Sequence, residues 1–594
     1  MTATADLLSP DNYIIEPIIG NKLIIYQLMT RLFGNKNTTN QYYGSIEENG
    51  VGKFNDITDV ALAEIKKLGA THVWFTGILE HATMTDFTAY GIKPDYAGVV
   101  KGRAGSPYAV KDYYDVSPDL AVSVPNRMAE FEALLARTHT QHLKAIIDFI
   151  PNHVARTYQS DACPPGTEDF GALDNVALSF DPQNNFYYLP GQKLVVPSDY
   201  KPLGERETVA ASVPFEEYPA KVTGNDVFSA TPSINDWFET IKLNYGVDIQ
   251  NNRAPYFEPT PSTWRKMRDI LLFWTRKGVD GFRCDMAEMV PVEFWAWVIP
   301  QVKAINPEII FIAEIYNSQQ YHNYIHTGKF DFLYDKVGLY DSLRWLMEGH
   351  GNTADITKCW KEETYGISSH MLRFLENHDE QRIASPQFAD NPWTAVPAMT
   401  VAATLSTGPV MIYFGQEVGE PGKGAEGFQG DDGRTSIFDY WGVPEHQKWM
   451  NNGRFDGGQL SAEQINLRSF YQQLLQLTQT QEALQIGQFY QMHPLVNGHA
   501  HHSKIYAYIR HTVQQRLLIV VNFDLYHTLD ITIPVAAAEK QLLFGQSLAL
   551  NLTDLLLFSP DSGVKCLTDN AHTIISLHLP PLSAYIFTSS PTKI

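Results

Sequence analysis

The chain has 594 residues, of which 44% are hydrophobic and 12% aromatic, so it can bury a large core and is too long for one ordinary domain. Its formal net charge of -21 disfavours nucleic acids and anionic membranes as partners and fits a soluble protein with neutral or cationic ligands. Four widely spaced cysteines form no CxxC pair, which argues against a zinc ribbon or a disulfide framework. The first residues lack the pattern of a signal peptide, and no apolar run reaches a membrane-spanning length. We therefore expect a cytoplasmic protein, the alternative being a secreted chain numbered without its signal.

Short runs of β-branched and aromatic residues alternate with longer amphipathic segments as far as about residue 480. Most of these runs are continuously apolar, which is typical of parallel strands buried on both faces. Eight alternations predict a parallel (β/α)8 barrel, and no GxGxxG opens a helix after the first strand to favour a doubly wound sheet. The amphipathic segments include 59–69 and 127–139. The predicted strands are 23–29, 71–77, 143–150, 279–285, 309–315, 330–335, 371–377 and 409–415, with 330–335 the weakest.

Two regions depart from this alternation. Residues 154–246 are rich in loops and far exceed a usual connection, which indicates a domain inserted after the third strand. Residues 489–594 contain short, partly alternating strands with turn residues between them, which predicts an all-β sandwich. The barrel is therefore assigned to residues 1–153 and 247–488.

Three carboxylates follow three of the predicted strands. Asp285 closes the segment GFRCD, Glu314 lies near the end of 309–315, and Asp379 follows 371–377. Because parallel barrel strands end at the same face, these side chains are expected to meet there. Two carboxylates suffice to cleave a glycosidic bond: one protonates the leaving oxygen and the other attacks or activates water. A third helps to stabilise the positively charged transition state.

The neighbours of two carboxylates predict a division of labour. Arg283 lies two residues before Asp285, on the same side of the strand, so it is expected to lower the pKa of Asp285 and keep a nucleophile ionised. The alternative is a purely structural ion pair. Glu314 follows apolar residues, so desolvation is expected to raise its pKa and favour a general acid.

Short motifs extend this interpretation along the chain. DFIPNH (148–153), GFRCD (281–285), IAEI (312–315) and NHD (377–379) follow the third, fourth, fifth and seventh predicted strands in that order. Together with the segments 107–116 and 408–417, they resemble the α-amylase family of glycoside hydrolases over nearly the whole chain.

The resemblance implies a retaining enzyme that cleaves the α-1,4-glucosidic bonds of starch, glycogen or maltodextrins. Asp285 would form a covalent glycosyl intermediate, Glu314 would act as acid and then base, and Asp379 would bind ring hydroxyls. Aromatic residues of the insert, such as Trp237, either stack on sugars or form the core of the insert. The implied sugar contacts are Arg283, His153, His378, Tyr108 and Arg382.

One departure from the family bears on the reaction. Glu288 and Met289 stand where many endo-acting amylases have Lys and His, so an acidic contact replaces a cationic one beside the leaving-group sugar. A transglycosylase, such as a 4-α-glucanotransferase, therefore stands as the alternative. The third hypothesis is an inactive carbohydrate-binding or partner protein on the same fold, and the three intact acids argue against it.

A metal site is left open by the sequence. Asn152 matches a calcium ligand of many family members, and Asp236 is the candidate partner. Calcium takes six or more oxygen ligands, which the sequence does not display. We expect no organic cofactor, an oligo- or polysaccharide substrate, and neither nucleic acid nor membrane as a partner.

Overall fold

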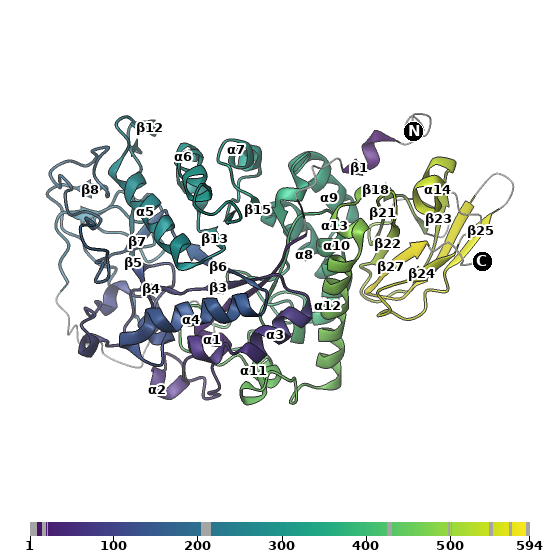
Figure 1. The fold of residues 1–594 in the computed structure, drawn as a ribbon, viewed down its shortest axis with the longest axis horizontal. Helices are drawn as coiled ribbons and strands as arrows, with labels where there is room; N and C mark the ends of the chain where they lie inside the picture. The colour runs from purple at the N-terminus through teal and green to yellow at the C-terminus, as the bar shows by residue number, and fades with distance from the viewer. Residues whose placement is uncertain are drawn as a thin grey trace.

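The computed structural model describes residues 9–14, 20, 22–203, 215–424, 430–496, 499–500, 502–545, 551–568 and 573–589. A barrel occupies the middle of the molecule, the loop-rich insert lies at one end, and a β-sandwich lies at the other (Figure 1). Among the described residues, no helix is both long and apolar enough to cross a membrane.

Eight parallel strands form the barrel, as predicted from the sequence. The first seven each pair with their neighbours in chain order, and the eighth pairs with the first. One bridge between Arg373 and Val410 joins the seventh strand to the eighth. The strands are almost wholly buried because helices cover them from outside, which explains their continuously apolar sequences. They are β2 (Ile24–Met29), β3 (His72–Thr76), β6 (Lys144–Phe149), β13 (Gly281–Cys284), β14 (Ile310–Ala313), β15 (Phe332–Tyr334), β16 (Met371–Leu372) and β17 (Val410–Tyr413).

The helix at Asp59–Leu68 begins and ends where local chemistry predicts. The Thr58 side chain accepts from the Ala61 amide, and Gly69 follows with a φ of 120°. The helices are α1 (Thr30–Phe33), α2 (Ile46–Asn49), α3 (Asp59–Leu68), α4 (Arg127–Thr140), α5 (Ser262–Lys277), α6 (Val292–Lys303), α7 (Tyr321–His326), α8 (Asp341–Met347), α9 (Thr353–Lys358), α10 (Ala395–Thr404), α11 (Pro444–Met450), α12 (Ala462–Thr480), α13 (Glu482–Gln485) and α14 (Ala537–Phe544).

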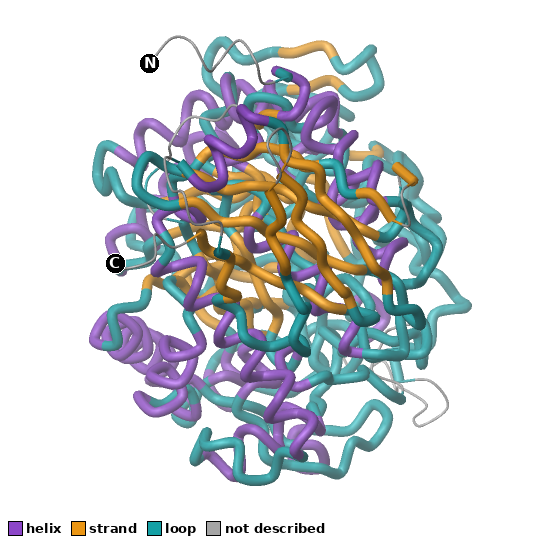
Figure 2. The backbone as a smooth tube through the Cα atoms, turned by 90° about the vertical axis from the view of Figure 1, so that its right-hand side faces the viewer, coloured by secondary structure: helices purple, strands orange, loops and turns teal. Residues whose placement is uncertain are grey.

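The C-terminal region is a sandwich of two antiparallel sheets, which Figure 2 shows from the sandwich end. Helix α10 of the barrel contacts β22 and β27 and is buried along its whole length, so barrel and sandwich share a core. One sheet contains β18 (Gln488–Met492), β21 (Ile505–His511), β22 (Arg516–Asn522), β27 (Ser583–Ser589) and β24 (Leu552–Asp554); the other contains β20 (His499–Ala500), β19 (Leu495–Val496), β23 (Leu529–Val535), β26 (Thr573–Leu579) and β25 (Lys565–Thr568).

The N-terminal segment differs from the sequence prediction. Strand β1 (Tyr13–Ile14) pairs with β18 at the edge of the six-stranded sheet, whereas we had assigned residues 1–153 to the barrel. A strand of two residues carries no periodicity, so the sequence gives no sign of this pairing.

The insert is rich in loops, as predicted, and has short strand pairs. Three of its aromatic residues, Phe186, Tyr187 and Tyr188, are buried in hydrophobic clusters, so most of each ring packs against other side chains. The pairs are β7 (His153–Ala155) with β10 (Thr240–Lys242), β8 (Tyr188–Leu189) with β9 (Ala220–Lys221), and β11 (Val247–Asp248) with β12 (Ala254–Pro255); β4 (Leu79–His81) pairs with β5 (Val110–Val116) between β3 and β6 of the barrel.

Candidate active site

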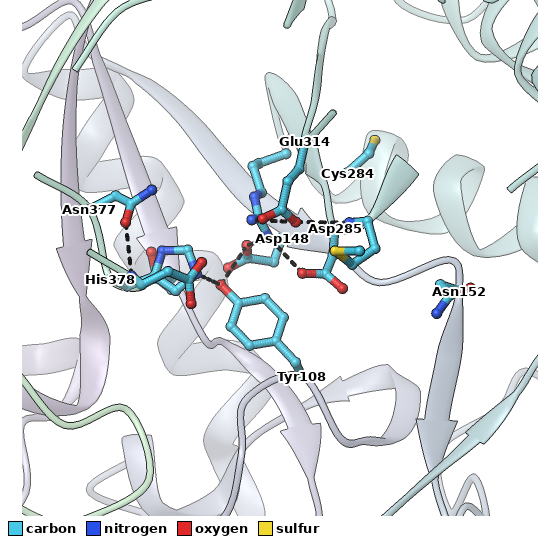
Figure 3. A network of polar contacts seen from close by, with 12 residues as sticks. Tyr108, Asp148, Asn152, Cys284, Asp285, Glu314, Asn377 and His378 are labelled. Carbon is cyan, nitrogen blue, oxygen red and sulfur yellow. Dashed lines mark hydrogen bonds and ion pairs between the residues drawn. The ribbon is translucent and has the colours of Figure 1, made fainter. Parts of the chain in front are cut away.

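The carboxyl ends of neighbouring barrel strands bring the predicted acids together. Arg283 on β13 is in register with Asp148 on β6 and with Ile312 on β14. Asp285 lies two residues beyond Arg283 and points to the same side, whereas Cys284 points away (Figure 3). Glu314 follows β14 directly, so its carboxylate reaches the same place.

A single guanidinium joins these carboxylates. Arg283 Nη1 lies 2.9 Å from Asp285 Oδ1 and 3.6 Å from Asp148 Oδ1, and its Nη2 lies 2.8 Å from Glu314 Oε2. The rings of Trp74, Tyr108 and Tyr334 surround the guanidinium, which is fully buried. Arg283 therefore holds the carboxylates from beneath. Arg283 is not among the residues that line the pocket above the acids, and its predicted contact with a sugar stays a prediction.

The surroundings of Glu314 also differ from the expectation. Its Oε1 accepts a hydrogen bond from the Tyr316 hydroxyl at 2.6 Å, and its Oε2 accepts from the Met286 amide at 2.9 Å. Tyr316 follows the IAEI segment, and Met286 lies in the loop after β13. The apolar residues before Glu314 therefore do not describe the surroundings of its carboxylate.

The expected pKa shift of Asp285 is reversed. Burial and the negative charges of Glu314 and Asp379 raise the pKa of Asp285 well above its usual value, although Arg283 opposes them. Asp285 and Glu314 share one guanidinium, so the proton that the raised pKa of Asp285 favours in the free site lies close to the Glu314 carboxylate.

Asp379 is the ionised member of the group. Burial acts to raise its pKa, but His378, Arg283 and Arg434 outweigh it and lower the pKa to about 2. The Nε2 atom of His378 lies 3.0 Å from Asp379 Oδ2, and the side chain of Asp379 is 40% exposed. The third carboxylate is therefore a charged acceptor that can bind hydroxyl groups.

Tyr108 lies between the histidine and the carboxylates (Figure 3). Its hydroxyl is 2.5 Å from His378 Nε2 and 3.4 Å from Asp148 Oδ1, and the rings of Tyr108 and His378 stack with centroids 5.2 Å apart. Gln27 Nε2 contacts His378 Nδ1 at 2.8 Å. His378 is thus buried behind Tyr108 and positions it and Asp379; it does not line the pocket.

A pocket of about 290 Å³ opens above these residues. The three acids line it together with Tyr108, His153 and Trp237, so the structure brings these predicted residues together. Burial, and to a lesser degree Lys242, lower the pKa of His153 to about 3, so its imidazole is neutral. A pocket with charged acceptors and aromatic walls has the chemistry that sugar rings require.

Two predicted sugar contacts lie elsewhere. The guanidinium of Arg382 is fully buried; its Nη1 is 2.9 Å from Glu376 Oε2 and donates to the carbonyl of Phe414. Arg382 therefore supports the barrel wall and does not border the sugar pocket. Glu288 lines a neighbouring pocket, and its Oε2 accepts from the Asn317 amide at 3.0 Å, so its acceptor-side role stays a prediction.

Sequence reasoning missed several functional residues. Asp148 accepts from Trp74 Nε1 at 3.2 Å and from the Gly77 amide at 3.1 Å, and it faces Arg283. Its place in DFIPNH, in register with Arg283 on the next strand, was the available signal. Tyr316 and its bond to Glu314 had no such signal, because that contact depends on the backbone course after β14.

The two candidate calcium ligands, Asn152 and Asp236, each have a protein partner in the structure. The amide oxygen of Asn152 accepts from the ammonium of Lys242, and Asp236 Oδ2 accepts from the Ser233 amide at 2.7 Å within a turn. In the described part of the chain, no cluster of three or more His, Cys, Asp or Glu suits a metal ion. A cationic ammonium on the expected ligand does not fit calcium.

A parallel barrel that carries two carboxylates bridged by one guanidinium and an ionised third at its carboxyl-terminal face is typical of an enzyme of the glycoside hydrolase class. The family model described as "Alpha amylase, catalytic domain" matches residues 27–189 and 235–484, and that for the "C-terminal all-beta domain" matches residues 495–590. The chain belongs to the α-amylase family.

Similar proteins within this family differ in activity. Alpha-amylase 3 of Dictyoglomus thermophilum is 22% identical over 64% of this chain and 68% of its own length. An alpha-1,4-glucan:maltose-1-phosphate maltosyltransferase of Cereibacter sphaeroides is 43% identical over 56 residues, only 9% of either chain. The crystal structure of an α-amylase from Geobacillus thermoleovorans complexed with acarbose aligns over 97% of this chain and 100% of its own, with a TM-score of 0.60 and 17% identity. The last similarity shows the fold.

Proposed function

We propose that the chain is a retaining α-glucan hydrolase that cleaves α-1,4-glucosidic bonds of starch, glycogen or maltodextrins. The bridge through Arg283 is the observation that carries this proposal. Asp285 and Glu314 bind two nitrogens of one guanidinium, which keeps their carboxylates close. Retaining enzymes need a spacing of roughly 5–5.5 Å, whereas inverting enzymes need a wider gap for a water molecule.

The reaction then has two steps. Glu314 gives its proton to the glycosidic oxygen while an oxygen of Asp285 attacks the anomeric carbon; the bond to the leaving sugar breaks and a glycosyl ester forms. Glu314, now ionised, next takes a proton from water, whose oxygen attacks the same carbon and releases Asp285. The Tyr316 hydroxyl and the Met286 amide hold the Glu314 carboxylate through both steps. Ionised Asp379 binds ring hydroxyls.

A second candidate is transfer of the glycosyl group to a sugar. A separate pocket of about 290 Å³ is lined by Glu288, Phe257 and Tyr324, among others, next to the loop that follows Asp285. A sugar held there would present a hydroxyl to the intermediate in place of water, without any change in Asp285 or Glu314.

The test is a time course of products from maltoheptaose, resolved by chain length and by the anomer first released. Shorter α-anomeric products support the proposed hydrolase, and chains longer than the substrate support transfer. Early release of the β-anomer would contradict retention and with it the role of Asp285. The cytoplasmic location stays a prediction from the sequence.

A further inference from the structure

A buried ammonium joins three segments beside the active site. Lys242 ends β10, in register with His153 on β7, and is 3% exposed. Its Nζ donates to the amide oxygen of Asn152, lies 2.8 Å from Asp226 Oδ1, and lies 3.4 Å from the carbonyl oxygen of Met289. These partners belong to the end of the third barrel strand, to a turn of the insert, and to the loop after Asp285.

The partners of Lys242 are the oxygen types that bind hard cations: an amide oxygen, a carboxylate and a backbone carbonyl. Here the chain supplies the positive charge itself. Asp226 also pairs with Arg253 at 3.2 Å, so two cationic side chains face one carboxylate. A calcium ion at this point would meet a net positive charge and a carboxylate already paired on both oxygens.

We propose that Lys242 takes the structural place of a metal ion at this junction, so that the folded enzyme does not depend on calcium. The ammonium fixes which way the Asn152 amide points: its oxygen faces Lys242, and its nitrogen donates to the Gly224 carbonyl at 2.8 Å. The same nitrogen lies 3.1 Å from His153 Nδ1, which makes Nδ1 an acceptor and leaves the ring proton on Nε2.

Lys242 is therefore a positioning residue for the pocket. It orients His153, which lines the pocket, through Asn152, and it holds the loop that begins at Asp285 through the carbonyl of Met289. This role of Lys242 does not depend on the proposed reaction, because it concerns only whether a side chain or a metal ion supplies the positive charge between Asn152, Asp226 and Met289.

The experiment compares the wild type with Lys242→Met, which keeps the length of the side chain and removes its charge. Lys144→Met is the matched control, since Lys144 is 55% exposed and pairs with Asp280 at 3.1 Å. Thermal unfolding is followed for each protein in excess EDTA and in calcium chloride, and the metal content of the purified wild type is measured. The Tm of the wild type is expected to be the same in both solutions, with no bound calcium.

Lys242→Met is expected to lower the Tm by several degrees and kcat by several-fold, because Asp226 and Asn152 lose their cation, while Lys144→Met changes neither. In Lys242→Ala, which leaves space at the junction, calcium is expected to raise the Tm. Tightly bound calcium in the wild type, or a Tm that falls in EDTA and recovers with calcium, would overturn the proposal. That wild-type result decides the question even if both Lys242 variants fail to fold, and it is independent of the products formed from maltoheptaose.

Discussion

Two buried cations organise neighbouring parts of this molecule, and they do so with opposite charge balances. Arg283 faces three carboxylates, Asp285, Glu314 and Asp148, so its cluster is net negative. Lys242 and Arg253 share one carboxylate, Asp226, so the second cluster is net positive. The excess negative charge raises the pKa of Asp285, so a proton stays available at this cluster. The positive cluster holds segments of the chain in place.

Arginine suits the fixing of two acids, and lysine suits the joining of several segments. The planar guanidinium of Arg283 offers separate nitrogens to Asp285 and Glu314, which fixes the two acids relative to one another. The ammonium of Lys242 is a compact charge that donates to oxygens in several directions, much as a bound ion attracts oxygen ligands from several sides. Substitutions in each cluster should therefore have different consequences.

The largest effect is expected for Asp285→Asn. Loss of the nucleophile should lower kcat/KM by at least about 10³-fold, measured with maltoheptaose. The Tm should stay the same or rise, because Glu314 and Asp379 no longer face a like charge at this position. A variant that keeps most of its activity would remove Asp285 from the mechanism.

Arg283→Met should damage stability as well as activity. It leaves three buried carboxylates without their cation, a type of change that costs about 3–5 kcal/mol of unfolding free energy. The deficit should shrink at lower pH, where the released carboxylates become protonated. Urea unfolding at several pH values measures this, with Arg276→Met on the exposed face of α5 as control. A deficit independent of pH would mean that lost packing, not charge, is responsible.

The buried histidine His446, which lies outside both clusters, links the stability of the fold to pH. Burial lowers the pKa of His446 to about 3; its Nε2 contacts the carbonyl of Phe33 at 2.8 Å, and its Nδ1 has no hydrogen-bond partner among the residues that the structure describes. Below the ordinary pKa of about 6.5, the unfolded chain binds a proton that the folded chain refuses, so acid destabilises the fold. This residue should cost about 1.4 kcal/mol per pH unit between about pH 6 and pH 3.

His446→Gln removes this titration and keeps a donor for the Phe33 carbonyl. The difference in unfolding free energy between the variant and the wild type should therefore move in favour of the variant as the pH falls. If the unfolding free energies of the two proteins fall with pH at the same rate, His446 takes up a proton in the folded state as readily as in the unfolded chain.

Sequence patterns predicted two features of this structure: the repeated strands of the barrel and the residues at the ends of those strands. The eight barrel strands and the meeting of Asp285, Glu314 and Asp379 follow from periodicity and from the shared direction of parallel strands. The environment of each side chain could not be predicted, because it depends on residues distant in sequence. Tyr316 and Met286 surround Glu314 with donors, and the burial of Arg382 depends on contacts to other strands and loops. The ammonium of Lys242 contacts Asn152 at a sequence separation of 90 residues.

The smallest effect is expected for Tyr316→Phe, which tests how finely the acid is held. The Tyr316 hydroxyl donates to Glu314 Oε1 at 2.6 Å and so fixes one oxygen of the acid. Without this donor the carboxyl group is held only through its other oxygen, by the Met286 amide and Arg283, and kcat/KM with maltoheptaose should fall by roughly ten-fold or less. Tyr334→Phe is the matched control, because the Tyr334 hydroxyl contacts Arg283 Nε at 3.1 Å. An equal loss in both variants would mean that the guanidinium cluster as a whole, and not the bond from Tyr316, positions the acid.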